Sequence, residues 1–185
     1  FGADGFMYCG SIGPIDLSEK QRHALMHLGV VLTQRFDLRG IFGIDAIVDW
    51  RSQIWPVEVN PRYPASIEIL ERALGLKAVE IHVDACRRGK LPELVTTRSR
   101  RWSGKAVLYA KKDCVVNDAF AQRVVAENHG TPWPAVADIP ETGKEIPVGE
   151  PITTVLAECE NREQLEQMLR DRVARLETML YGEGG

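Results

Sequence analysis

The chain has 185 residues, of which 44% are hydrophobic and 26% are charged, and its formal net charge is -3. This balance is typical of a globular protein and excludes a disordered or fibrous one, and the length suits one domain or a domain with a small appendage. The slight acidity argues against a nucleic-acid binder, which needs a surplus of lysine and arginine to neutralise phosphates. No apolar run approaches the roughly 20 residues of a membrane-spanning helix, so neither nucleic acid nor a membrane is an expected partner.

The order of the elements follows from the spacing of apolar residues and from the positions of glycine and proline. Asp16 or Ser18 can cap the first helix, whose apolar residues recur at spacings of three and four. In chain order the sequence predicts a strand over 6–12, a helix over 17–36, strands over 41–48 and 54–59, helices over 66–74 and 77–88, a strand over 105–110, a helix over 119–127, a strand over 152–157 and a helix over 162–180. Strands and helices are interleaved and the pair 41–48 and 54–59 reads as an antiparallel hairpin, so we predict an α+β fold.

Two further features concern the state of the chain. It holds four cysteines at wide spacings with no C-x2-C pair, which favours unpaired thiols in a reducing cytoplasm, with disulfides as the alternative. The chain begins at Phe1 rather than at methionine, and its first residues already have the character of folded structure. We therefore expect a fragment whose N-terminal part is missing.

The predicted hairpin carries polar side chains inside its apolar runs. Asp45 lies on the first strand, and Glu58 and Asn60 lie on the second. Because side-chain direction alternates along a strand, Glu58 and Asn60 share a face, and the hairpin brings Asp45 opposite that face. Oxygen ligands of this kind suit Mg²⁺, which takes one or two protein carboxylates and completes its shell with phosphate and water. Arg62 follows closely, and its planar guanidinium suits a phosphate or a carboxylate.

A solvated strand face is the alternative interpretation of these carboxylates, because strand carboxylates usually point to solvent. The apolar neighbours argue against it, since a carboxylate in an apolar setting is costly unless a cation pairs with it.

These residues resemble the metal-binding hairpin of the ATP-grasp superfamily, in which an acidic residue on one strand is followed about a dozen residues later by E-x-N on the next. Here 13 positions separate Asp45 from Glu58, and the second strand reads PVEVNPR. The E-x-N-P-R form, the helical SIEILERALG after it, and the downstream GKAVLYA and ADIPETGKEIPVGEPITTVLAE are most similar to the biotin-carboxylase-related branch of predicted ATP-dependent carboligases. The resemblance covers roughly residues 6–180.

The resemblance implies a function and a set of roles. The fold would be the C-terminal subdomain of ATP-grasp, a largely antiparallel sheet with flanking helices, in an ATP-dependent, ADP-forming carboxylate–amine or carbon–nitrogen ligase that acts through an acyl phosphate. Glu58 would bridge two Mg²⁺ ions, with Mn²⁺ as a substitute, and Asp45 and Asn60 would each hold one. Arg62 would be the catalytic residue on the transferred phosphate, and Lys105, on the GKAVLYA strand, would contact the nucleotide. The partners would be ATP, a small carboxylate and an amine, with a homodimer as one option for assembly.

The resemblance also implies an incomplete site. Family members bind phosphates with lysines and a Gly-rich loop upstream of this hairpin, and the 40 residues before Ile41 hold a single lysine, Lys20. We therefore expect residues 1–90 to form the C-terminal half of an ATP-grasp domain and residues 91–185 to form an extension packed on it, with no activity in isolation. The alternative is a non-catalytic ATP-grasp-like nucleotide-binding or assembly module that keeps the hairpin but performs no ligation.

Two other clusters have simpler interpretations. His23 and His27 stand four apart on a helix, a spacing that zinc enzymes use, but Ala24 lies where such enzymes carry a glutamate. A group of basic residues surrounds Trp102 and allows nucleic-acid contact, an anionic substrate or a solvated face, of which the solvated face is the preferred interpretation. Its members are Arg87, Arg88, Lys90, Arg98, Arg100, Arg101 and Lys105.

Overall fold

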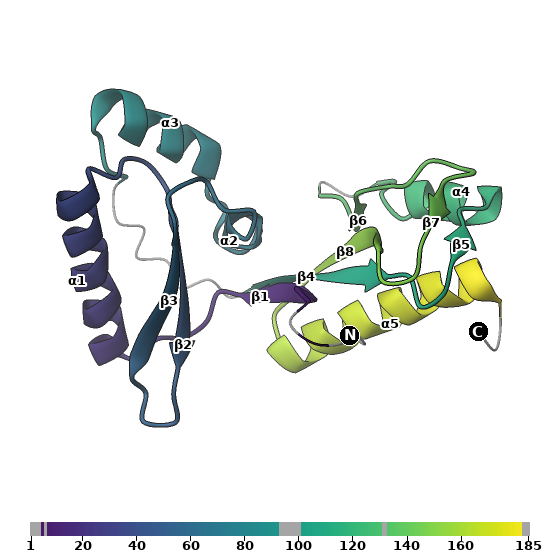
Figure 1. Ribbon diagram of the computed structural model, residues 1–185, viewed down its shortest axis with the longest axis horizontal. Helices are drawn as coiled ribbons and strands as arrows, with labels where there is room; N and C mark the ends of the chain where they lie inside the picture. Colours follow the sequence, from purple (N-terminus) through teal and green to yellow (C-terminus); the bar gives the residue numbers. More distant parts are fainter. Residues whose placement is uncertain (1–4, 6, 93–100, 131–132, 183–185) are drawn as a thin grey trace. The chain divides into compact units, whose positions relative to one another are not determined.

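The structure is a computed structural model that describes residue 5 and residues 7–92, 101–130 and 133–182. Contacts divide the chain into two compact units, which we call the sheet unit (residues 1–13 and 99–185) and the hairpin unit (residues 14–98). Each contains both helices and antiparallel strands (Figure 1), so the predicted α+β class with a largely antiparallel sheet is confirmed.

The sheet unit is built on a four-stranded antiparallel sheet in the order β1-β4-β8-β6. The bounds of these strands are Gly10–Gly13, Trp102–Tyr109, Pro151–Cys159 and Val136–Ala137. A second small sheet pairs β5 (Cys114–Val115) with β7 (Glu145–Ile146). The first strand thus pairs with a strand about ninety positions later in the chain, a pairing that the sequence did not indicate.

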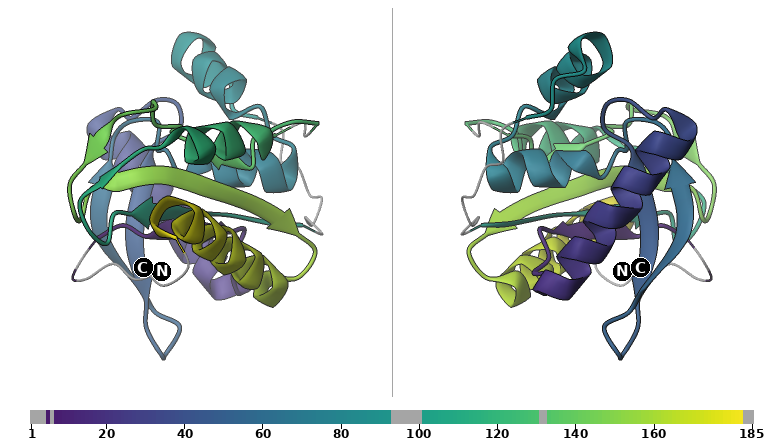
Figure 2. Two further views of the ribbon diagram at one scale, coloured as in Figure 1. Left: turned by 90° about the vertical axis from the view of Figure 1, so that its right-hand side faces the viewer. Right: turned by 90° about the vertical axis from the view of Figure 1, so that its left-hand side faces the viewer.

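Helix α5 (Arg162–Tyr181) runs along one face of this sheet, beside β4 and β8 (Figures 1 and 2). Its apolar residues recur at spacings of three and four: Leu165, Leu169, Val173 and Leu176 are buried, and Leu180 packs against the same core while partly buried. A side chain at Gly104 would lie 3.0 Å from Cδ1 of Leu169, so this glycine allows the helix to approach β4 closely. Together with α4 (Asp118–Ala126), these elements enclose the main hydrophobic core, which contains Phe120.

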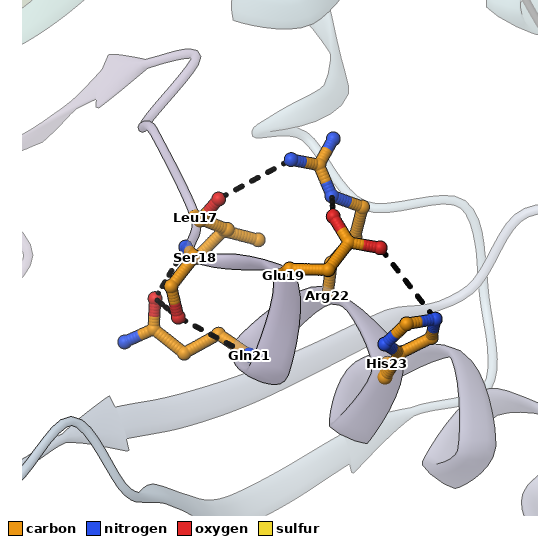
Figure 3. A network of polar contacts seen from close by, with 6 residues as sticks. All are labelled: Leu17, Ser18, Glu19, Gln21, Arg22 and His23. Atoms are coloured by element: carbon orange, nitrogen blue, oxygen red, sulfur yellow. Dashed lines mark hydrogen bonds and ion pairs between the residues drawn. The ribbon is translucent and has the colours of Figure 1, made fainter.

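The hairpin unit contains α1 (Glu19–Phe36), β2 (Gly43–Val48), β3 (Ile54–Asn60), α2 (Ile67–Leu74) and α3 (Ala78–Arg88). Helix α1 begins at a capping box (Figure 3): Ser18 Oγ accepts the Gln21 N–H at 3.3 Å, and Gln21 Oε1 accepts the Ser18 N–H at 2.8 Å. Of the two caps that the sequence allowed, Ser18 is therefore the one used.

The hairpin unit buries few apolar side chains. Among its described residues, 14–92, the buried hydrophobic ones are Leu32, Ile69 and Ala78, whereas Phe36, at the end of α1, is 66% exposed. Strands β2 and β3 form a two-stranded sheet by themselves, with many apolar side chains in solvent. The β2–β3 hairpin is therefore stabilised mainly by its own hydrogen bonds and not by a large hydrophobic core.

Other expectations have mixed outcomes. All four cysteines are unpaired, and none of the helices in the described part of the chain is long and apolar enough to cross a membrane. The division at residues 90 and 91 stays a prediction, although the contacts group β1 with the later strands rather than with the hairpin. Arg98 and Arg100 of the basic group lie outside the described residues.

Candidate functional site

The register of the hairpin places Asp45 directly opposite Glu58 and Gly43 opposite Asn60. Side chains of directly opposed strand residues lie on one face, and so do those of residues two apart along a strand. The three predicted ligands therefore share a face, and Asn60 Nδ2 donates a hydrogen bond to Asp45 Oδ2 at 3.3 Å. The strand register thus places Asp45, Glu58 and Asn60 on the same face, as the alternation of side chains predicts.

An irregularity next to these residues shapes the strand. The pairing shifts after Asp45, because Ala46 lies opposite Pro56 and leaves Val57 without a partner. Proline cannot donate to a ladder and is tolerated at such bulges. The unpaired Val57 adds one residue to β3 between Pro56 and Glu58. With this extra residue, Asp45 and Glu58, which are 13 positions apart, lie directly opposite each other.

The carboxylates are exposed, which contradicts the premise that apolar neighbours would bury them. Asp45 and Glu58 both lie in solvent, and so do the apolar neighbours Ile47 and Val57, at 61% and 65%. The expected desolvation of these two carboxylates is therefore wrong, and no burial cost forces a cation onto their oxygens. What remains is the geometry of two carboxylates and an amide on one face, accessible to a ligand from solvent.

Arg62 follows the strand through a tight turn. Its backbone N–H donates to the carbonyl of Asn60 at 2.7 Å, a bond between residues two apart that reverses the chain around Pro61. The side chain is exposed. Arg62 thus starts from the same end of the hairpin as Gly43 and Asn60.

The tip of the hairpin uses another carboxylate for structure. Asp49 Oδ1 accepts the N–H groups of Arg51 and Gln53 at 2.9 Å each, and Oδ2 accepts Trp55 Nε1–H at 3.0 Å. The Trp55 hydrogen bond, followed by the Gln53 one, holds the pKa of Asp49 below its ordinary value. Asp49 is therefore committed to the turn and is not a ligand candidate, a role that an aspartate at the start of a polar connection could have indicated.

The base of the hairpin contains a residue that the sequence analysis missed. His82, on α3, accepts the backbone N–H of Ile41 through Nδ1 at 2.9 Å. Its ring meets that of Tyr63 edge-on, with centroids 5.5 Å apart. No local signal pointed to His82, because both contacts join segments that are distant in the chain.

Lys105 lies in the sheet unit rather than in the hairpin unit. It stands on the central strand β4 opposite Ser11, is 7% exposed, and has Nζ 5.8 Å from the centre of the Tyr8 ring. Because Gly104 faces α5, the alternation of the strand directs Lys105 to the opposite face. Its assignment to the nucleotide stays a prediction.

Within the part of the chain that the structure describes, no three His, Cys, Asp or Glu side chains gather in an arrangement that could hold a metal. His23, one of the pair at zinc-like spacing, instead has Nε2 3.5 Å from Glu19 Oε1 (Figure 3). The hairpin set offers two carboxylates and one amide, so a cation there needs further ligands from phosphate or water. That requirement suits Mg²⁺ and not a structural zinc ion.

Comparison with known proteins gives a family match over the first part of the chain and a similar fold over most of it. Residues 1–66 match the model of the ATP-grasp domain family. No curated protein matches the sequence.

Among solved structures, an L-amino acid ligase from Bacillus licheniformis has a TM-score of 0.67 at 16% identity, over 95% of this chain and 45% of that one. The N5-carboxyaminoimidazole synthase from Aspergillus clavatus, in complex with ADP and its ribonucleotide, has a TM-score of 0.64 at 15% identity, over 94% and 46%. The biotin carboxylase domain of a thermophilic 2-oxoglutarate carboxylase, bound to bicarbonate, has a TM-score of 0.63 at 13% identity, over 96% and 40%.

The chain thus spans less than half the length of these enzymes, and at such identities the likeness concerns the fold. The match to the ATP-grasp domain family therefore covers residues 1–66, and along most of the chain the fold is shared with these ligase, synthase and carboxylase structures.

Proposed function

We propose that the protein is an ATP-dependent, ADP-forming carboxylate–amine ligase and that this chain supplies its metal-binding hairpin. The observation that carries the proposal is the pairing of Asp45 with Glu58, with the Asn60 amide hydrogen-bonded to Asp45 at 3.3 Å. Oxygen ligands on one exposed face fit Mg²⁺ or Mn²⁺ carried by a nucleotide.

The residues present fit the metal by their donor chemistry. Glu58 would bridge two ions and Asp45 and Asn60 would each hold one, and the bound ions would neutralise charge on the β- and γ-phosphates. Arg62 would bind the transferred phosphoryl group through its guanidinium. Phosphoryl transfer asks the protein chiefly for positioning and for charge neutralisation, which these side chains offer.

In the proposed reaction, a carboxylate oxygen attacks the γ-phosphorus of ATP and releases ADP. The resulting acyl phosphate is attacked at its carbonyl carbon by an amine, which loses a proton as the amide forms and inorganic phosphate leaves. The similar structures support this class by their names, a ligase and an ADP-bound synthase. Cytoplasmic location, a homodimer and a contact from Lys105 stay predictions.

The function is tested by supplying the intact protein with Mg·ATP and with carboxylate and amine pairs, and measuring ADP and amide together. We expect both products only when a suitable pair is present, because the acid must accept the phosphoryl group first. Nucleotide binding without ADP release for any pair would favour the non-catalytic module instead.

We expect the 185-residue chain alone to provide only part of the nucleotide site. The similar enzymes are more than twice as long as the segment matched here, and Lys20 is the single lysine before Ile41. Calorimetric titration of the isolated chain with Mg·ATP should therefore give no affinity or only a weak one. A micromolar dissociation constant would contradict this expectation.

A further inference from the structure

His82 connects both ends of the hairpin that carries the proposed ligands. Its Nδ1 accepts the N–H of Ile41, two residues before β2 begins, and its ring packs edge-on against Tyr63, three residues after β3 ends. Helix α3 is thereby joined to the segment leading to Asp45 and to the segment leaving Arg62. Among the described residues of this unit only a small core supports the hairpin, made of Leu32, Ile69 and Ala78.

The hydrogen bond to Ile41 decides what the imidazole can do. A ring nitrogen that accepts a backbone N–H carries no proton, so the proton of the neutral ring sits on Nε2. That nitrogen lies 3.7 Å from Cys86 Sγ, whose thiol is 3.6 Å from the carbonyl of Arg39. With Nδ1 accepting the Ile41 N–H and Nε2 protonated, the neutral ring has no free lone pair for a metal.

Gly40 leaves room for the His82 ring. Gly40, next to Ile41, has a φ of 79°, which disfavours any residue with a side chain. A Cβ there would lie 2.7 Å from Nδ1 of His82 and 2.6 Å from Sγ of Cys86. A side chain at position 40 would therefore clash with the imidazole that accepts the Ile41 N–H.

The geometry points to His82 as a positioning residue, which sets the base of the hairpin and thereby the separation of Asp45, Asn60 and Arg62. The hydrogen bond fixes the start of β2 relative to α3, and the ring contact fixes the end of β3 relative to the same helix. The expected effect on metal binding rests on the proposed function, whereas the hydrogen bond between Ile41 and His82 is independent of it.

The test compares two substitutions that remove different halves of the contact. His82→Phe keeps a ring against Tyr63 but has no acceptor for Ile41, and His82→Gln keeps an acceptor without the ring. Gly40→Ala disturbs the same contact without changing His82. His23→Phe, at an exposed histidine on α1, is the matched control.

Two readouts separate positioning from stability. Hydrogen exchange of the Ile41 amide should be faster in His82→Phe and Gly40→Ala and close to normal in His82→Gln and in the control. In protein that is fully folded by circular dichroism, Mn²⁺ affinity should fall about tenfold in His82→Phe, in the range found for supporting residues around metal ligands. It should recover only in part in His82→Gln, which restores the acceptor for Ile41 but not the ring against Tyr63.

Each result bears on one statement. Unchanged Ile41 exchange in His82→Phe would overturn the contact, and unchanged Mn²⁺ affinity in that variant would overturn its positioning role. If the unaltered protein binds no Mn²⁺, or if Asp45→Asn binds it equally well, the proposed ligand set fails while the exchange measurement still decides the role of His82 at the hairpin base.

Discussion

Replacing Glu58 by glutamine is expected to abolish ADP formation by the intact protein while leaving its fold unchanged. The substitution keeps the shape of the side chain but removes the charge that would bridge two cations beside the phosphates. Loss of one preorganised electrostatic contact in a transition state typically costs about 10²–10³-fold in rate. Because Glu58 is exposed, its neutralisation removes no buried partner, and the circular dichroism spectrum and unfolding midpoint should stay as they were.

The matched control for this prediction is Glu80→Gln. Glu80 lies on α3 in the same unit, with a side chain that is 65% exposed and paired at 3.5 Å with Lys77. Exposed pairs of this kind contribute little to stability, so turnover and unfolding should both be unaltered. ADP release is followed with the substrate pair found by screening. Unaltered turnover in Glu58→Gln would refute the assignment, and equal losses in both variants would point to a general charge effect.

Replacing Phe120 by alanine should destabilise the sheet unit strongly. Phe120 is completely buried on α4, among the residues that α5 and β8 also line. Removing a buried phenyl ring costs the transfer free energy of the ring and that of the cavity left behind, together about 3–5 kcal/mol. Urea unfolding followed by circular dichroism should show the corresponding fall in the free energy of unfolding.

The same substitution at Phe36 provides the comparison. Phe36 ends α1 in the hairpin unit and is 66% exposed, so Phe36→Ala should change the free energy of unfolding by no more than about 0.5 kcal/mol. A similar loss in both variants would mean that the exposed apolar face of α1 is covered in solution, and the account of where the core lies would then be wrong.

The hairpin shows which features of the structure can be predicted from the sequence. Two β-branched runs joined by a five-residue connection, four residues of which are polar, predict antiparallel strands, and the alternation of side chains puts Glu58 and Asn60 on one face. These are short-range rules, and β2 and β3 follow them. The burial of Asp45 was predicted wrongly because an apolar neighbour in sequence says nothing about which surface covers it. Here Ile47 and Val57 are themselves exposed.

The long-range contacts show the other limit. The pairing of Gly10–Gly13 with β4 and the hydrogen bond from Ile41 to His82 join residues that are separated by dozens of positions. Such contacts depend on how whole elements pack, and no local periodicity records them. The strands β5 and β7 could not be predicted either, because each has two residues, too few to show an alternation of apolar and polar side chains.

By itself, then, the sequence determined the helices, the hairpin and the residue types that point to a metal and a phosphate. Local backbone preference and the repeat of side-chain direction suffice for these. Only the tertiary structure decided that the carboxylates are exposed, that a bulge at Val57 brings Asp45 opposite Glu58, and that His82 joins both ends of the hairpin. The reason is that exposure, strand register and contacts between distant segments depend on how whole elements pack, and this packing is set only in the folded chain.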